Sequence, residues 1–229
     1  MAGEHERVDE AVTTEGSRWA DLYGMLFVLI LVSLLLTAAN TKWLKVAAVL
    51  VQGCVLLFAF LVARAPRRAW RVAIVLVPLA VILGIAGRFV DSKPAEVVAA
   101  GVNLVLPAAA IVVLGRRILM EPYVSGRTVL GLLSVLLLIG MTFAATYIMI
   151  AVVSGEPFFV QTNDAQPVDF TYFSFVTLAT VGYGDFTAAN PMPRMLAAIE
   201  GLSGQLYLVT VVAVAVSRVR TRRDRSRDG

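Results

Sequence analysis

Six long apolar runs, separated by short polar or charged stretches, make up most of this chain. The runs are Asp21–Ala39, Trp43–Ala63, Trp70–Val90, Val97–Leu114, Thr128–Val153 and Arg194–Ser217. The hydrocarbon core of a bilayer is about 30 Å thick and needs roughly 20 helical residues to cross it, which is close to the length of each run. The runs lack the alternation of apolar and polar residues that barrel strands show. The pattern therefore predicts an all-α membrane protein with six transmembrane helices.

Composition agrees with this fold class, because 59% of the 229 residues are hydrophobic and only 16% are charged. A soluble domain cannot bury so much apolar surface in one core. Residues 1–18 are polar and carry no signal-peptide pattern, so we expect a disordered tail. Residues 19–117 then form a domain of four transmembrane helices, 118–217 form a second membrane domain, and 218–229 form a basic tail.

The basic residues indicate how the chain is oriented. If the N-terminus is cytoplasmic, fifteen of the twenty Lys and Arg residues lie on the cytoplasmic side, as the positive-inside rule requires. We therefore expect a multi-pass protein of the inner (plasma) membrane with both termini in the cytoplasm. The arginines of 218–229 would also suit nucleic acid, but no folded nucleic-acid module accompanies them. Fixing topology or touching anionic lipid is the better interpretation.

A shorter apolar segment, 169–179, lies between the fifth and sixth runs and is followed directly by Thr-Val-Gly-Tyr-Gly-Asp at 180–185. The segment is too short to span a bilayer, and Asp169 suits a helix N-terminus, so a half-length helix entering from outside is predicted. Gly182 and Gly184 reach positive φ at little cost, which lets successive carbonyls face one way. A ring of such carbonyls replaces the water around a potassium ion.

The stretch from Thr177 to Asp185, Thr-Leu-Ala-Thr-Val-Gly-Tyr-Gly-Asp, resembles the signature of the potassium-channel pore family. The resemblance covers 128–217 and implies a pore domain made of an outer helix, a re-entrant pore helix, a selectivity filter and an inner helix. It implies that four copies line one pore and that the filter binds potassium through these residues: Thr180, Val181, Gly182, Tyr183 and Gly184. The segment 199–208 is similar to the inner helix of bacterial two-helix pore modules, which implies a gating hinge at Gly204.

Two departures from the family pattern occur beside the filter. The usual paired threonines are here Ala179 and Thr180, and the usual paired tryptophans of the pore helix are here Tyr172 and Phe173. Neither departure removes a carbonyl that faces the pore axis. The departures leave three properties open: blocker sensitivity, filter stability and inactivation.

Acidic residues near the filter are expected to have two kinds of role. Asp185, together with Asp169, Asp164 and Glu156, is expected to make the outer mouth attractive to cations. Glu200 lies inside the last span, where a carboxylate is costly and faces protein or water. It is either a brace behind the filter or a proton-sensitive gate. The alternative is a residue near the outer interface that pairs with Arg194 or is simply protonated.

The fourth run argues against classical voltage gating, because Val97–Leu114 contains no basic residue and Arg116 and Arg117 follow its end. Moving one charge across the membrane contributes about 2.3 kcal/mol per 100 mV, and a steep response needs several such charges. The first four spans are then a scaffold or a sensor of lipid or tension. The connection 116–127 is interpreted as a loop or as a segment lying along the cytoplasmic interface.

The sequence thus predicts one subunit of a passive, potassium-selective homotetrameric channel. Alternatives are a weakly selective cation channel, a potassium transporter subunit and a non-conducting membrane sensor. An enzyme is not expected, since the spans hold no phosphate loop and no nucleophile beside a base. No cofactor is expected besides the permeant potassium, and the single Cys54 and His5 form no metal-binding pair. The expected partners are other copies of this chain and membrane lipid.

Overall fold

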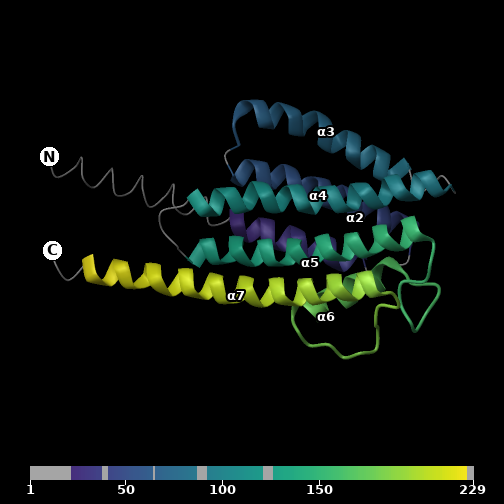
Figure 1. Ribbon diagram of the computed structural model, residues 1–229. Coiled ribbons are helices and arrows are strands. Elements are labelled where there is room, and N and C mark those ends of the chain that lie inside the picture. The colour runs from purple at the N-terminus through teal and green to yellow at the C-terminus, as the bar shows by residue number, and fades with distance from the viewer. Residues whose placement is uncertain (1–21, 38–40, 64, 87–91, 121–125, 226–229) are drawn as a thin grey trace.

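The computed structural model describes residues 22–37, 41–63, 65–86, 92–120 and 126–225, and all regular elements in these ranges are helices (Figure 1). They are Leu22–Thr37, which bears no label in the figure, α2 (Lys42–Val62), α3 (Arg67–Ala86), α4 (Lys93–Met120), α5 (Gly126–Ser154), α6 (Pro167–Leu178) and α7 (Pro191–Arg225). The all-α prediction is confirmed for this part of the chain. The predicted tail at 1–18 lies outside the described residues.

Three helices in the described residues are long and apolar enough to cross a membrane: Arg67–Ala86, Lys93–Met120 and Val129–Ser154. Two further apolar helices, Leu22–Thr37 and Val46–Val62, are shorter. Each predicted run coincides with a helix. The length-and-composition test supports three of the six expected spans, and the count of six stays a prediction.

Two helices continue past the ends that the apolar runs predict. α4 extends beyond Leu114 to Met120, and Ile118 is buried in the core. The interpretation of 116–120 as a loop is therefore wrong, because the packing of Ile118 keeps this stretch helical beyond the charged pair; 121–125 lie outside the described residues. α7 likewise continues past Ser217 to Arg225. No glycine or proline interrupts that stretch, and arginine favours helices.

α4 and α5 join the two halves of the molecule. α4 packs against α2, α3 and α5, whereas α5 also contacts α6 and α7 (Figure 1). Fully buried side chains from three helices meet in the shared core, among them Leu26, Leu114 and Leu138. The first four helices therefore pack as one body with α5, which in turn contacts the short helix α6 and α7.

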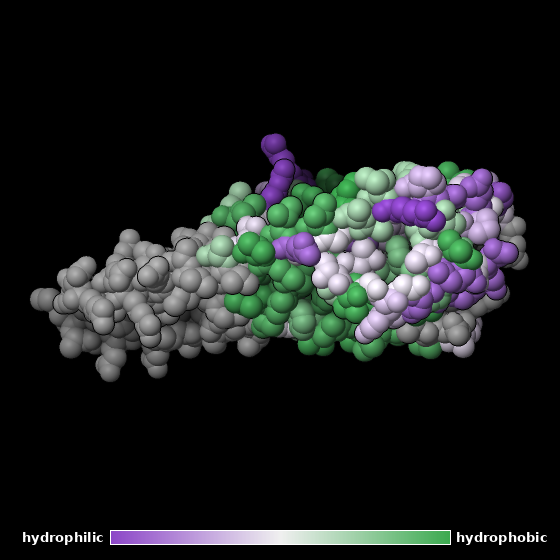
Figure 2. Space-filling view, turned by 60° about the horizontal axis from the view of Figure 1, so that its bottom comes forward, coloured by the Kyte–Doolittle hydropathy of each residue, from purple (hydrophilic) through white to green (hydrophobic). Residues whose placement is uncertain are grey.

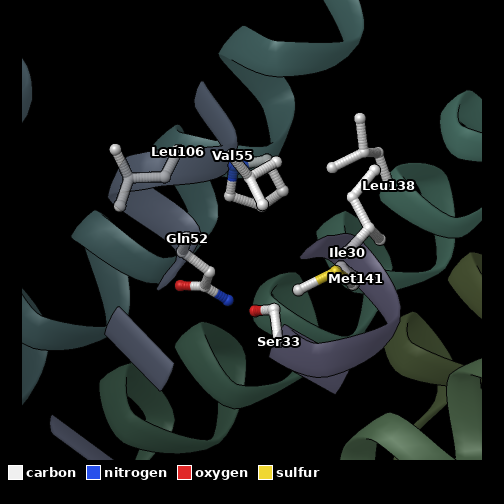
Figure 3. A pocket seen from close by; sticks show the side chains of 8 residues that line it. Ile30, Ser33, Gln52, Val55, Leu106, Leu138 and Met141 are labelled. Carbon is white, nitrogen blue, oxygen red and sulfur yellow. The ribbon is translucent and has the colours of Figure 1, made fainter. Parts of the chain in front are cut away.

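A polar pair lies inside this otherwise apolar core. Ser33, on the first helix, and Gln52, on α2, point toward each other in a pocket of about 10 Å³ (Figure 3). Ser33 is fully buried and Gln52 is 9% exposed. Neither the Ser33 Oγ nor the Gln52 Oε1 has a hydrogen-bond partner in the structure. Because buried polar atoms without partners cost free energy, this pair is a weak point in the packing of the first two helices.

The outward face of α3 is apolar. Small and branched residues such as Ala73 and Val77 are buried, whereas Val75 and Ile82 are 65% and 61% exposed. In the space-filling view a hydrophobic band crosses the middle of the molecule, and hydrophilic residues gather at the end where the loops around α6 lie (Figure 2). Exposed apolar bands of this kind suit contact with lipid.

Candidate pore site

α6 is the half-length helix that the sequence predicts, and local chemistry fixes its start. Pro167 occupies the first turn, where its missing N–H costs nothing. The Asp169 Oδ2 accepts a hydrogen bond of 2.7 Å from the Gln166 backbone N–H, which favours a helix beginning here. The predicted role of Asp169 at the N-terminus of this helix is therefore confirmed.

Glycines allow α6 to approach α5 and α7 closely. A Cβ added to Gly140 on α5 would lie 2.9 Å from the Phe175 ring, and one added to Gly204 on α7 would overlap the Leu178 carbonyl oxygen. One turn earlier, a Cβ on Gly201 would make only an ordinary contact of 3.5 Å with the Thr177 oxygen. Gly204, the predicted hinge, lies inside the continuous helix α7 and has this close contact as a structural reason to be glycine.

The chain beyond α6 turns through three left-handed residues at alternate positions. φ is +56° at Thr180, +57° at Gly182 and +79° at Gly184. Glycine adopts such angles readily, but for a β-branched residue like Thr180 they are a strained conformation of the kind that concentrates at functional sites. The sequence predicted the two glycines and missed Thr180, since no local signal marks a threonine for positive φ.

The start of this segment is bonded back onto α6. The Thr180 N–H donates to the Thr177 oxygen and the Val181 N–H donates to the Val176 oxygen, both at 2.9 Å. These bonds use amide hydrogens that would otherwise be free. They anchor residues 180–184, called the strand below, at the carboxyl end of the helix. The inner end of the segment is thus held by the same helix that carries it.

The outer end is held by a side-chain bond that sequence reasoning did not identify. The Tyr172 hydroxyl donates to the Asp185 Oδ2 at 2.7 Å, and this hydrogen bond raises the pKa of Tyr172 to about 12. The Phe186 N–H donates to the other oxygen, Oδ1, at 3.1 Å. Asp185 therefore ties the strand to the first half of α6.

The other acidic residues expected at the outer mouth have separate partners. Glu156 accepts a 3.1 Å hydrogen bond from the Asn190 side chain, and Asp164 accepts one of 3.3 Å from the Gln166 side chain. Both side chains are exposed. They lie in the loop that follows α5, and their attraction for cations stays a prediction.

An aromatic cluster supports the outer half of α6. Its buried rings are Tyr147, Phe158, Phe159, Phe170 and Phe173, with neighbouring ring centroids about 5–6 Å apart. The loop after α5 also pairs with the loop before α7: the Val160 N–H donates to the Thr187 oxygen at 3.0 Å. Aromatic edge-to-face contacts stabilise such a cluster beyond its burial, so the cluster attaches the loop to the helix.

Glu200 is fully buried where α5, α6 and α7 meet. The Tyr147 hydroxyl lies 2.5 Å from its Oε2, and the Ser174 hydroxyl is hydrogen-bonded to its Oε1. The basic residue expected as a partner, Arg194, instead donates its Nε–H to the Ala188 oxygen at 2.8 Å. Sequence reasoning singled out Glu200 but missed Tyr147 and Ser174, because single polar residues in apolar runs carry no spacing signal.

One side of α7 presents an apolar stripe to the outside of the chain. Each member is between 51% and 69% exposed, and the spacing alternates between three and four residues: Met192, Met195, Ile199, Leu202, Leu206 and Val209. Such spacing places all six side chains along one face of the helix, as in helix–helix seams. Val181 and Tyr183 in the strand are also exposed, by 51% and 70%. Helices of the same chain therefore leave these two side chains at least half exposed.

Comparison with known proteins bears on this half of the molecule. No curated protein and no solved structure was found to match the chain. A family model described as an ion channel matches residues 133–221, which run from α5 through α6 and the left-handed strand into α7. The match supports an ion channel rather than an enzyme, and it agrees with the apolar helices of a membrane protein.

Proposed function

We propose that the chain is one subunit of a potassium-selective channel in which four copies surround a single pore. The carbonyl oxygens of 180–184, with the Thr180 hydroxyl, form stacked rings of oxygen that replace the water of a potassium ion. Conduction is passive and needs no cofactor. The alternation of left-handed residues at 180, 182 and 184 is the observation that carries this proposal, because it lets successive carbonyls turn to the same side.

The exposed apolar surface supports assembly. Tyr183 and Val181 are side chains that the described chain leaves more than half exposed, and the stripe on α7 lies on the same helix that packs against α6. Neighbouring subunits cover this surface in the proposed tetramer, where the side chains set the width of the filter. A closed ring of identical subunits forms when two different faces of each subunit meet head to tail.

Gating and location follow from the rest of the chain. The apolar stretch 97–114 lies within α4 and contains no charge for a field to move, so opening is not steeply voltage-dependent. The first four helices act as a scaffold or as a sensor of lipid or tension. The excess of basic residues on one side favours an inner (plasma) membrane protein with both termini in the cytoplasm.

Reversal potentials test this function. Purified protein in planar bilayers, with sodium on one side and potassium on the other, should show a large reversal potential that is negative on the potassium side, and barium should block the current. A reversal potential near zero indicates instead the weakly selective cation channel. A complete absence of current and of flux into potassium-loaded liposomes indicates the membrane sensor. The same recordings at several voltages should show no steep sigmoidal activation.

A single substitution in the filter tests whether 180–184 forms the pore. Gly182→Ala forces a side chain into a left-handed conformation at a site with open space around it, so strain rather than collision is introduced. The variant should fold and assemble but lose potassium current. Unchanged selectivity in this variant would contradict the assignment of the pore to 180–184.

A further inference from the structure

The contacts of Glu200 define how many protons the buried cluster holds. The Ser174 Oγ lies within hydrogen-bond distance of two oxygens, the Gly140 carbonyl oxygen at 2.7 Å and the Glu200 Oε1. A serine hydroxyl has one hydrogen to donate, and a carbonyl oxygen accepts only. If Ser174 donates to Gly140, the hydrogen between Ser174 and Glu200 must come from Glu200.

The second oxygen of Glu200 fits the same arrangement. The Tyr147 hydroxyl donates to Oε2 at 2.5 Å, so Oε2 is an acceptor and Oε1 is left as the donor. A neutral carboxylic acid supplies one donor and one acceptor in this way. An ionised carboxylate accepts only, so Ser174 would have to turn its hydrogen toward Glu200 and the Gly140 carbonyl would lose it.

No cation compensates a charge at this site in the described residues. Four other ionisable side chains described on the packed helices bond elsewhere: Asp169 with the Gln166 N–H, Tyr172 with Asp185, Arg194 with the Ala188 oxygen and Tyr207 with the Leu132 oxygen. Tyr147 is the ionisable side chain that faces Glu200, and it donates a hydrogen bond. A buried carboxylate without a cation is costly, which favours the neutral form.

We infer that Glu200 holds a proton and acts as a positioning residue. The protonated carboxyl group on α7 donates a hydrogen bond to Ser174 on α6, and Ser174 donates its own hydrogen to the Gly140 carbonyl oxygen on α5. Ser174 lies in the helix whose carboxyl end anchors the strand 180–184. Loss of the proton breaks the link between α6 and α5 and leaves a buried charge. Conduction therefore falls as pH rises and the site ionises. This consequence for conduction rests on the proposed channel function.

Glu200→Gln distinguishes a proton from a charge at this site. A glutamine amide donates from Nε2 to Ser174 and accepts at Oε1 from Tyr147, so it copies the neutral acid and cannot ionise. Potassium flux into liposomes should stay within about twofold of the wild type at acid pH, because all three hydrogen bonds remain. The flux should then persist into the alkaline range in which the wild type fails.

Two further variants separate the hydrogen-bond chain from general packing. Ser174→Ala removes the link to Gly140, and we expect flux to fall by about tenfold, the order that an unsatisfied buried partner costs. Ser134→Ala is the matched control, since Ser134 is equally buried on α5 and bonds only within its own helix, to the Leu130 oxygen. This control should leave flux and its pH dependence unchanged.

An infrared measurement tests the proton without relying on conduction. Purified wild-type protein in lipid should show the carbonyl stretch of a protonated carboxylic acid near neutral pH, and Glu200→Gln should lack that band. If the band is absent from the wild type, Glu200 is ionised and the inference is wrong. It is also overturned if Glu200→Gln folds but abolishes flux, or if its pH dependence equals that of the wild type. If the band is present but no variant conducts potassium, the proton assignment stands and the channel proposal fails.

Discussion

At the residue scale, Thr180 is the position where local preference and function conflict. A β-branched residue at a φ of +56° carries strain of about 1–3 kcal/mol, which a glycine would avoid. The proposed function gives a reason for the conflict, since only a hydroxyl-bearing side chain adds another oxygen below the carbonyl rings. The strain is then maintained by the bonds that hold 180 and 181 to α6.

This interpretation predicts different outcomes for two substitutions at Thr180. Thr180→Val keeps the shape and the branching but removes the hydroxyl, so barium block should weaken by about tenfold, corresponding to about 1.4 kcal/mol for one lost oxygen ligand. Thr180→Ser keeps the hydroxyl and should block like the wild type. The measurement is the barium concentration that halves potassium current. Equal block in the two variants would show that the hydroxyl does not face the ion.

The sequence could predict the features that depend on local residue preferences, and it could not predict those that depend on contacts between distant residues. Gly182 and Gly184 were predictable because glycine marks left-handed positions, and Asp169 was predictable because acidic residues favour helix N-termini. The partners of Glu200 were not, because Tyr147 lies 53 positions away in the chain and Ser174 lies 26 positions away. Contacts between residues so far apart depend on how the helices pack, which no local pattern records.

At the scale of elements, the close packing of α6 on α7 gives a better reason for a glycine at position 204 than the hinge that the resemblance implies. The helix ends against α7 at the position where a Cβ on Gly204 would overlap the Leu178 oxygen. Most helix bounds were predictable to within a few residues because apolar runs are long. The extensions of α4 to Met120 and of α7 to Arg225 were not. The extension of α4 depends on the burial of Ile118 against other helices.

Alanine substitutions on α7 test the role of this close contact. Gly204→Ala should push the end of α6 outward and lower the free energy of unfolding by about 1–3 kcal/mol, as overpacking does in tight cores. Gly201→Ala is the matched control on the same helix, because its Cβ meets the Thr177 oxygen at an ordinary 3.5 Å. Thermal unfolding in lipid measures both. If Gly204→Ala alters channel opening but not stability, the hinge interpretation is the better one.

At the scale of the whole molecule, the two sides of the described chain differ in how much apolar surface is buried within the chain. The first four helices and α5 share one core. The strand and α7, by contrast, expose Val181, Tyr183 and the apolar stripe. Lipid could cover the stripe, but it would not bring strands from different chains together around an ion. In the proposed tetramer the stripe therefore faces other subunits.

Cysteine cross-linking tests which of these covers the stripe. The natural Cys54 is exposed and is first replaced by Cys54→Ser. Leu202→Cys, Leu206→Cys and Val209→Cys then sample successive turns of the stripe, and a short thiol cross-linker should join subunits at one or more of them. Thiols must come close together to react, so lipid-facing positions should not be joined. Val75→Cys on α3, which is 65% exposed, is the control and should remain monomeric on denaturing gels. Monomers at all three α7 positions would mean that the stripe faces lipid, and the four strands would then lack the common axis on which carbonyl coordination of potassium depends.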